Sequence, residues 1–210
     1  VAGMRVGGVR LATLPANLAI PVCAIGGHLG LPPLLPYSGY VLDNWYRLDK
    51  SGGISLDNIA MHQNFLGGQD ENWFVLVHVA IEAEAGRALQ LATELVEAAA
   101  QHDAVKVEQL LTDMNRVWDA MNAHFDRMPE RCDPYIYYQR VRPYIHGWKN
   151  NPALPDGLIY EGVAKFAGKP HAFRGQTGSQ SSIVPAMDGL FQVVHESDPL
   201  REFLDELHQY

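Results

Sequence analysis

The sequence predicts an all-α fold, and three observations support this prediction. Apolar residues recur three and four residues apart between Asp103 and Met128, which is the mark of an amphipathic helix. A second stretch, from Asp70 to Ala100, contains no proline and carries a similar apolar stripe over its second half. Alternating apolar and polar residues, which are typical of half-buried strands, are scarce throughout the chain.

The first part of the chain, residues 1–36, is predicted to be irregular. Glycines and prolines interrupt it repeatedly, and both residue types punctuate regular structure. We therefore expect a Pro/Gly-rich segment over 1–36 and a helical domain over 37–210. Residues 37–45 are short and aromatic, and their pattern fits either a short helix or a strand.

The long helices come next in the chain. Asp70 is a plausible N-cap for a helix of about 28 residues, although Gly86 weakens its middle. The helix from Asp103 is expected to end at Pro129, because proline cannot continue a helical hydrogen-bond ladder. The pair Asp133-Pro134 then predicts a third helix that runs to about Trp148.

Loops and shorter helices complete the predicted order. Residues 149–158 and 167–182 are rich in glycine, proline, asparagine and small polar residues, so both are expected to be loops. One helix is predicted over about 182–194. The pair Asp198-Pro199 predicts a last helix over 200–208.

Composition and charge exclude several classes of protein. The chain has 210 residues and a net charge of −8, which disfavours nucleic-acid binding and favours a small-molecule ligand. No stretch reaches the roughly 18 apolar residues that a membrane-spanning helix needs. The apolar start has no basic head or cleavage site, so a signal peptide is not expected. Two cysteines are too few for a disulfide scaffold, and we expect a cytoplasmic protein.

The histidines do not form a zinc motif, since no HExxH is present and neither cysteine lies in a CxxC pair. His78 and Glu82 lie one helical turn apart and could share a metal. However, His78 sits within the apolar run 74–81, where a lone histidine is more often a satisfied core residue. A cavity-facing histidine is the alternative, and the sequence leaves both open.

Two segments are candidates for ligand binding. The loop 173–182 has glycines that allow close backbone approach and hydroxyls that could hold a carboxylate, but it could equally be a surface loop in which Ser181 or Ser182 caps the next helix. Residues 135–144 place aromatic rings beside arginines, which fits a small carboxylate in an aromatic pocket. Nucleic acid is the alternative there, and the acidic total opposes it. Residues 157–162 begin like a phosphate-binding loop, but Val163 stands where lysine is required.

Several segments in the same order resemble the indoleamine 2,3-dioxygenase family, over about Leu14 to Tyr210. The segments are LPANLAIP (14–21), LPPLLPY (31–37), VLDNW (41–45), Asp133-Pro134, GWKNNP (147–152), GLIYEG (157–162) and QSS (180–182). The resemblance implies a heme enzyme of the all-α indoleamine/tryptophan dioxygenase fold. Such an enzyme opens the indole ring of tryptophan with O2 as co-substrate and forms N-formylkynurenine.

The resemblance also implies the site residues. The substrate pocket above the heme would contain Tyr37, Phe74, His78, Phe125, Tyr137, Arg142 and Gly178. Within this set Arg142 would pair with the substrate carboxylate and Gly178 would offer backbone to the ammonium. The heme would contact Phe125 and the loop Gly175, Gln176, Thr177, Gly178 and Ser179, with Thr177 on a propionate.

Two residues depart from the family pattern. His78 replaces a serine of the mammalian enzyme, and we assign it a catalytic role in positioning the indole N–H, with base catalysis as the lesser possibility. Tyr137 replaces a phenylalanine, which predicts a more polar pocket. Tyr137 and Arg142 are also about 140° apart on an ideal helix, so both can face one pocket only if that helix is distorted.

The family's iron-ligating histidine corresponds to a position beyond Tyr210, so we expect no metal ligand in this chain. The resemblance therefore predicts a fold that is incomplete at its C-terminal side and has the remainder of the polypeptide as partner. The alternatives are a relative that acts on another indole, a heme protein without turnover, or a fragment that binds no heme.

Overall fold

The computed structural model describes residues 5–6, 9–10, 12–145, 147–152, 154–175 and 178–195. These residues form two compact units. The first unit, here called the sheet unit, takes its described residues from within 1–37 and 138–180. The second, the hairpin unit, contains residues 38–137 and 181–195 of the described chain. Each unit has its own hydrophobic core.

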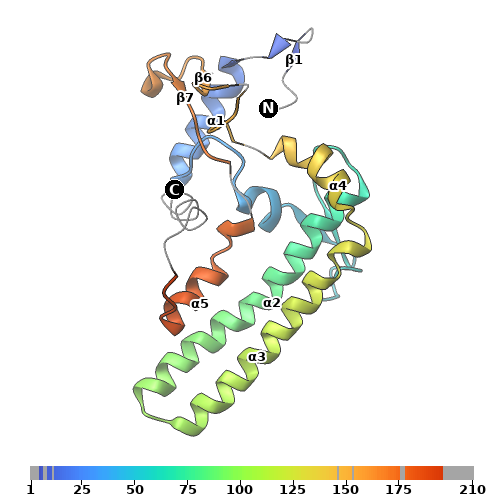
Figure 1. The fold of residues 1–210 in the computed structure, drawn as a ribbon, viewed down its shortest axis with the longest axis vertical. Helices are drawn as coiled ribbons and strands as arrows, with labels where there is room; N and C mark the ends of the chain where they lie inside the picture. The colour runs from blue at the N-terminus through green and yellow to red at the C-terminus, as the bar shows by residue number, and fades with distance from the viewer. Residues whose placement is uncertain are drawn as a thin grey trace. The chain divides into compact units, whose positions relative to one another are not determined.

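Two long helices dominate the hairpin unit (Figure 1). Helix α2 (Gln69–Ala100) and helix α3 (Ala104–Asp126) lie side by side and antiparallel, joined by a short turn. Asp103 caps α3 by accepting a hydrogen bond from the Lys106 backbone N–H at 3.0 Å, as expected. The N-cap of α2 is Gly68 rather than Asp70, so Asp70 and Glu71 lie in its first turn. Acidic residues stabilise that end of a helix through its dipole.

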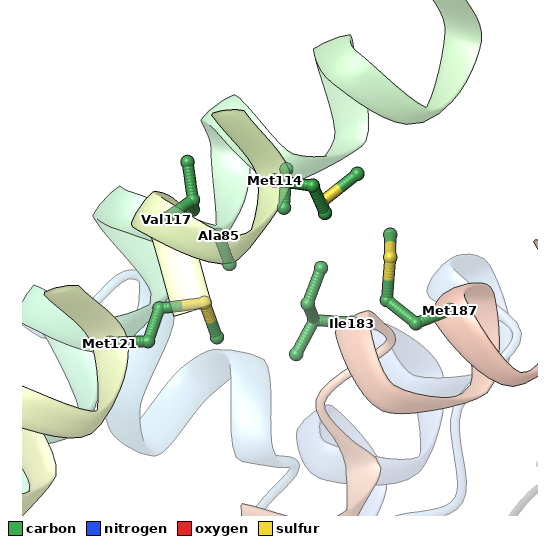
Figure 2. Packing of buried hydrophobic residues seen from close by; sticks show 7 residues of the cluster. Ala85, Met114, Val117, Met121, Ile183 and Met187 are labelled. Carbon is green, nitrogen blue, oxygen red and sulfur yellow. The ribbon is translucent and has the colours of Figure 1, made fainter. Parts of the chain in front are cut away.

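A third helix, α5 (Ile183–Phe191), packs on this hairpin. Figure 2 shows the contact, in which sulfur and aliphatic side chains from three helices meet. Buried members of this core are Ala85 and Ala88 of α2, Met114, Val117 and Met121 of α3, and Ile183 and Met187 of α5. The small alanines let α3 approach closely, and the flexible methionines fill the remaining space. The helices predicted over 70–100, 103–128 and 182–194 are thus confirmed, with slightly different ends.

The segment 37–45, which fitted either a helix or a strand, contains both. A single π-helical turn, η1 (Ser38–Leu42), is followed by strand β4 (Trp45–Arg47). Strand β4 pairs antiparallel with β5 (Ile59–Met61), so that Trp45 lies opposite Met61. This small hairpin precedes α2 in the chain and belongs to the same unit.

The helix predicted from Asp133 to Trp148 is broken in the structure. It consists of α4 (Pro134–Ile136), the π-helix η3 (Tyr137–Val141) and the 3-10 helix η4 (Arg142–Tyr144). Asp133 caps it as expected, accepting from the Ile136 N–H at 2.9 Å. Pro143 explains the break, because proline lacks an N–H and restricts the residue before it. Before Asp133, the 3-10 helix η2 (Met128–Glu130) follows α3.

The sheet unit contains α1 (Ala16–Leu29) and a three-stranded sheet. In the sheet, β6 (Leu158–Tyr160) pairs in parallel with β3 (Thr13–Leu14) and antiparallel with β7 (Pro170–His171). Its core comprises Ala19, Trp148, Leu154, Leu158, Tyr160 and Phe166. The unit also contains two short strands, β1 (Arg5–Val6) and β2 (Val9–Arg10), and two 3-10 helices, η5 (Ala164–Phe166) and η6 (Gly178–Gln180).

The prediction that residues 1–36 are irregular was wrong for α1. Pro15 stands just before the helix, where its missing N–H costs nothing, and Pro21 is accommodated inside it. Gly30 ends α1 with a φ of 71°, a conformation that favours glycine. The mainly helical class is nevertheless confirmed. The helix predicted over 200–208 lies outside the described residues. Among the described residues, no helix is both long and apolar enough to cross a membrane.

Candidate functional site

Three aromatic rings form a cluster in the hairpin unit, here called the ring cluster: Phe74, His78 and Tyr137. Phe74 and His78 lie one turn apart on α2 and so share a face. Their ring centroids are 4.4 Å apart. Tyr137, at the start of η3, stacks on Phe74 with centroids 4.0 Å apart and planes inclined by 24°. The structure therefore brings together three residues that were assigned to one substrate pocket.

His78 is partly buried within this cluster, and its chemistry follows from one hydrogen bond. Its Nδ1 lies 2.7 Å from the backbone oxygen of Phe74. A carbonyl can only accept, so Nδ1 carries the proton and Nε2 carries the lone pair in the neutral ring. Burial lowers the pKa of His78 below its usual 6.5, which outweighs the opposing effects of the Phe74 carbonyl and Glu82. His78 is therefore neutral at pH 7 and presents an acceptor nitrogen.

A polar network in the hairpin unit involves two residues that sequence reasoning missed, Glu71 and Tyr40. Glu71 is fully buried and accepts three backbone hydrogen bonds, from Phe65, Leu66 and Gly67. The Tyr40 hydroxyl donates to the same carboxylate at 3.3 Å. Burial is the main cause that raises the pKa of Tyr40, and nearby Tyr137 and Glu71 raise it further. Tyr40 is therefore a neutral donor at any physiological pH.

Sequence reasoning missed Tyr40 and Glu71 for a simple reason. An acid in the first turn of a helix is usually exposed and acts on the helix dipole. Only the folding of residues 65–67 over Glu71 shows that this carboxylate is buried and holds a loop. The one available signal was Tyr40, an aromatic residue in a short segment that already attracted attention.

Phe125 does not join the ring cluster. It lies near the end of α3 with 58% of its surface exposed. Among the described residues, no ring contact links Phe125 to Phe74, His78 or Tyr137. Phe125 therefore presents an open aromatic face rather than part of a closed wall.

The remaining predicted residues belong to the sheet unit. Tyr37 is buried, with 6% exposure. Arg142 begins η4 and is half-buried, and among the described residues its guanidinium forms no ion pair. The site assignment of neither residue is tested by these observations. No ion pair within the described residues therefore prevents the Arg142 guanidinium from binding the carboxylate of a ligand.

The glycine-rich loop is held by a close backbone contact. A Cβ added to Gly147 would collide with the backbone nitrogen of Gly175, so only glycine allows this approach. Gly178 and Ser179 begin η6, and the Ser179 side chain, Gln176 and Thr177 lie outside what the structure describes. After this loop, the Ser181 hydroxyl accepts a hydrogen bond from the Ile183 N–H at 3.4 Å, which supports the capping interpretation for that serine.

The distortion that Tyr137 and Arg142 require is present in the backbone. Residues 137–141 form a π-helix, whose i→i+5 hydrogen bonds differ from those of an α-helix. Residues five apart are close to one full turn apart in such a helix, rather than 140° out of phase as in an α-helix. The backbone is therefore distorted at this point, and the assignment of Tyr137 and Arg142 to one pocket stays a prediction.

The described residues contain no group of three or more histidine, cysteine or acidic side chains that could hold a metal ion. The suggested metal pair of His78 and Glu82 therefore gains no third ligand within this part of the chain. His78 instead uses Nδ1 to bond the Phe74 carbonyl, which fits a satisfied or cavity-facing histidine.

Comparison with known proteins agrees with the motifs. The family model described as indoleamine 2,3-dioxygenase matches residues 5–210. Indoleamine 2,3-dioxygenase 1 of Rattus norvegicus is 35% identical over 199 residues, which is 94% of this chain and 48% of the relative. Indoleamine 2,3-dioxygenase 2 of Homo sapiens is 32% identical over 94% of this chain and 47% of its own length.

Another relative carries a different name. A protein named myoglobin from Haliotis madaka is 29% identical over 205 residues, which is 97% of this chain and 51% of the relative. The chain thus spans about half the length of the curated relatives it matches. Because the family model covers nearly all of it, the chain belongs to the indoleamine 2,3-dioxygenase family.

Proposed function

We propose that this chain forms the substrate-facing part of a heme dioxygenase that opens the indole ring of tryptophan with O2 and yields N-formylkynurenine. Family membership supports heme dioxygenase chemistry on tryptophan in general terms. The specific reaction, the substrate and the residues below are our proposal.

The observation that carries the proposal is the neutral His78 in the ring cluster. An indole N–H is a hydrogen-bond donor and needs an acceptor inside an aromatic pocket. Nε2 of His78 is such an acceptor, because Nδ1–H is committed to the Phe74 carbonyl. Phe74 and Tyr137 supply flat apolar faces for the indole ring, with the geometry that aromatic pairs prefer. His78 thus positions the indole and need not remove its proton.

The amino-acid part of the substrate requires charged partners. The Arg142 guanidinium can grip a carboxylate through two parallel hydrogen bonds. Gly178 would offer its backbone to the ammonium group, and Tyr37, a buried aromatic residue, would be a further substrate-binding residue. Such contacts fix the orientation of the indole edge, and orientation contributes much of the rate in reactions of bound substrates.

Several features of this chain fit a bound heme. Phe125 exposes an aromatic face that a flat macrocycle could cover. The contact between Gly147 and Gly175 fixes the start of the loop that would run past a propionate, with Gln176, Thr177 and Ser179 following. When bound, the heme iron supplies the activation of O2. We propose that the iron ligand comes from the C-terminal remainder of the polypeptide, since relatives are about twice as long.

The test is tryptophan binding and turnover by the full-length protein, including the proposed C-terminal remainder, loaded with ferrous heme. Arg142→Ala should weaken tryptophan binding while heme binding, followed by its Soret absorption, is unchanged. Arg140→Ala is the matched control, because Arg140 is exposed and two residues away. Equal tryptophan affinity in the Arg142 variant would remove the clamp from the proposal. Formation of N-formylkynurenine is followed by its absorbance.

One second candidate is a heme protein that binds O2 without turnover. The relative named myoglobin favours it, because it covers nearly the whole chain. A stable oxygen complex in the presence of tryptophan, with no product, would support this function. A relative that acts on another indole is a further alternative, and Tyr137 in place of the family phenylalanine is the observation behind it. Parallel assays with substituted indoles and with the D-isomer of tryptophan would distinguish it.

We also propose a cytoplasmic location. Cys23 and Cys132 are both free thiols in the structure. Free thiols persist in reducing compartments, where disulfides are rare. Burial raises the pKa of the Cys132 thiol to about 11, so it is unreactive at neutral pH.

A further inference from the structure

We propose that Asp70 is a positioning residue that holds Tyr137 in its stacked place on Phe74 by fixing the backbone of Asp133. The inference deepens the proposed function and rests on it in one respect, namely that the ring cluster is the wall against which the indole lies. The placement of Tyr137 itself follows from hydrogen bonds, and it can be tested without substrate.

The first step is a bond between α2 and the start of α4. The side chain of Asp70, in the first turn of α2, accepts a hydrogen bond from the backbone N–H of Asp133 at 2.7 Å. Asp133 is the N-cap of α4 and lies 63 positions further along the chain. Both residues belong to the hairpin unit. Because a carboxylate is a strong acceptor, this bond fixes the Asp133 backbone to α2.

The second step leads from Asp133 to Tyr137. Oδ1 of Asp133 accepts from the Ile136 N–H at 2.9 Å, and the Asp133 carbonyl accepts from the Tyr137 N–H at 2.9 Å. The N–H of Asp133 is thus bonded to α2, while its carboxylate and carbonyl hold the turn that leads into η3. The place of this turn along α2 is therefore set by the bond to Asp70.

The third step is the spacing of the two contacts. Asp70 and Phe74 are four residues apart on α2, and Asp133 and Tyr137 are four residues apart in the other segment. The first member of each pair meets at the hydrogen bond, and the second members stack with ring centroids 4.0 Å apart. The two segments thus run in the same direction with matching register over one helical turn. A shift of Asp133 along α2 would move Tyr137 off the face of Phe74.

The connection before Asp133 is held at the start of α2 by a separate contact. Trp73 Nε1 donates to the Arg127 carbonyl at 2.8 Å. The guanidinium carbons of Arg127 and Arg131 lie 5.3 and 4.7 Å from the centroid of the Trp73 ring, where cations are attracted to an aromatic face. These contacts end two residues before Asp133. The bond to Asp70 fixes the next step, at the residue from which α4 starts.

The first measurement is hydrogen exchange in the full-length protein. Asp70→Ala removes the acceptor, and we expect the Ile136 and Tyr137 amides to exchange about fivefold faster, the effect of one lost hydrogen bond. Asp70→Asn removes the charge but keeps an acceptor oxygen, so exchange in this variant should stay slow. Unchanged exchange in Asp70→Ala, or equal acceleration in Asp70→Asn, would overturn the proposal.

The matched control is Asp119→Ala. Asp119 is an exposed aspartate on α3, so its loss should leave exchange at both amides unchanged. An acceleration in this control equal to that in Asp70→Ala would also overturn the proposal. Asp133 is exposed and Asp70 is half-buried, so the Asp70 variants create no large cavity and should keep the fold.

The second measurement is tryptophan affinity in the heme-loaded full-length protein. Asp70→Ala should weaken tryptophan binding by up to about fivefold, because the binding-competent placement of Tyr137 is populated less. Asp70→Asn should restore the affinity, and the Soret absorption of the heme should be unchanged in both variants. In a Tyr137→Leu background, Asp70→Ala should weaken binding no further, because Asp70 acts through Tyr137. Additive losses in the double variant would overturn the inference.

The two measurements together separate this inference from the proposed function. Weaker tryptophan binding in Tyr137→Leu but not in Asp70→Ala would overturn the inference and leave the proposed function standing. Faster exchange in Asp70→Ala, with tryptophan affinity unchanged in both variants, would show that the indole lies elsewhere. That result contradicts the proposed function and leaves the placement of Tyr137 by Asp70 intact.

Discussion

Replacing the buried carboxylate of Glu71 by an amide, in the variant Glu71→Gln, should destabilise the hairpin unit. Both carboxylate oxygens accept: Oε1 from the Phe65 N–H and the Tyr40 hydroxyl, and Oε2 from the Leu66 and Gly67 N–H groups at 2.8 and 3.3 Å. Glutamine has one oxygen and one NH2 group. In one orientation the NH2 group faces the N–H groups of Leu66 and Gly67, which can only donate. In the other it faces the Phe65 N–H and the Tyr40 hydroxyl, which donate to the carboxylate in the native protein.

The magnitude follows from the number of donors left without an acceptor. If the amide oxygen replaces Oε1, the N–H groups of Leu66 and Gly67 both lose their partner, and the opposite orientation deprives the Phe65 N–H. A buried donor without an acceptor costs about 1–3 kcal/mol, and the better amide orientation leaves one part-buried N–H, that of Phe65, without its acceptor. We therefore expect a loss of about 1 kcal/mol, or roughly 2–4 °C in Tm for a chain of this size.

Urea unfolding followed by circular dichroism measures this loss, and amide exchange at residues 65–67 locates it. Glu97→Gln is the matched control, because Glu97 is an exposed glutamate on the same helix. An unfolding midpoint for Glu71→Gln equal to that of the control would refute the reasoning. It would mean that the carboxylate does not hold the loop.

Three further results are expected. Gly147→Ala should destabilise the sheet unit by at least about 1–3 kcal/mol in thermal unfolding, because the new Cβ meets backbone, whereas Gly27→Ala should not, since nothing lies within 4 Å of its Cβ. The free energy of unfolding should fall as the pH drops below about 6.5. The reason is that the pKa of His78 is lowered in the folded protein, so the unfolded chain takes up the proton at a higher pH than the folded chain. In urea unfolding, the midpoint of the His78→Gln variant should lack this part of the pH dependence. Trp73→Phe should lose about 1 kcal/mol in urea unfolding, since Trp73 Nε1 donates to the Arg127 carbonyl at 2.8 Å, and an unchanged midpoint would contradict this.

The parts of the fold that could be predicted are those whose signal is local. Helices α2 and α3 show their apolar stripe in consecutive turns, and Asp103 and Asp133 act as caps next to the residues they serve. Helix α1 could not be predicted from composition, since its prolines and glycines are individually tolerated where they stand. Pro143 is a local cause for the end of this helical segment, but the π-helical turn after Ile136 did not show in the pattern.

The candidate site divides in the same way. Phe74 and His78 share a face because they are one turn apart, and this spacing is visible in the sequence. The stacking of Tyr137 on Phe74 joins residues far apart in the chain. Residues Gln176 and Thr177 lie outside the described residues, so their roles stay predictions.

The sequence by itself determined the helical class, the family and the residue types of the ring cluster, because periodicity, capping and motif order are properties of neighbouring residues. Only the tertiary structure decided that Glu71 is buried, that the Tyr40 hydroxyl donates to it, and that His78 keeps its proton on Nδ1. Burial and hydrogen-bond partners depend on which distant segments fold over a side chain. No pattern of nearest neighbours contains that information, and the chemistry of the ring cluster depends on it.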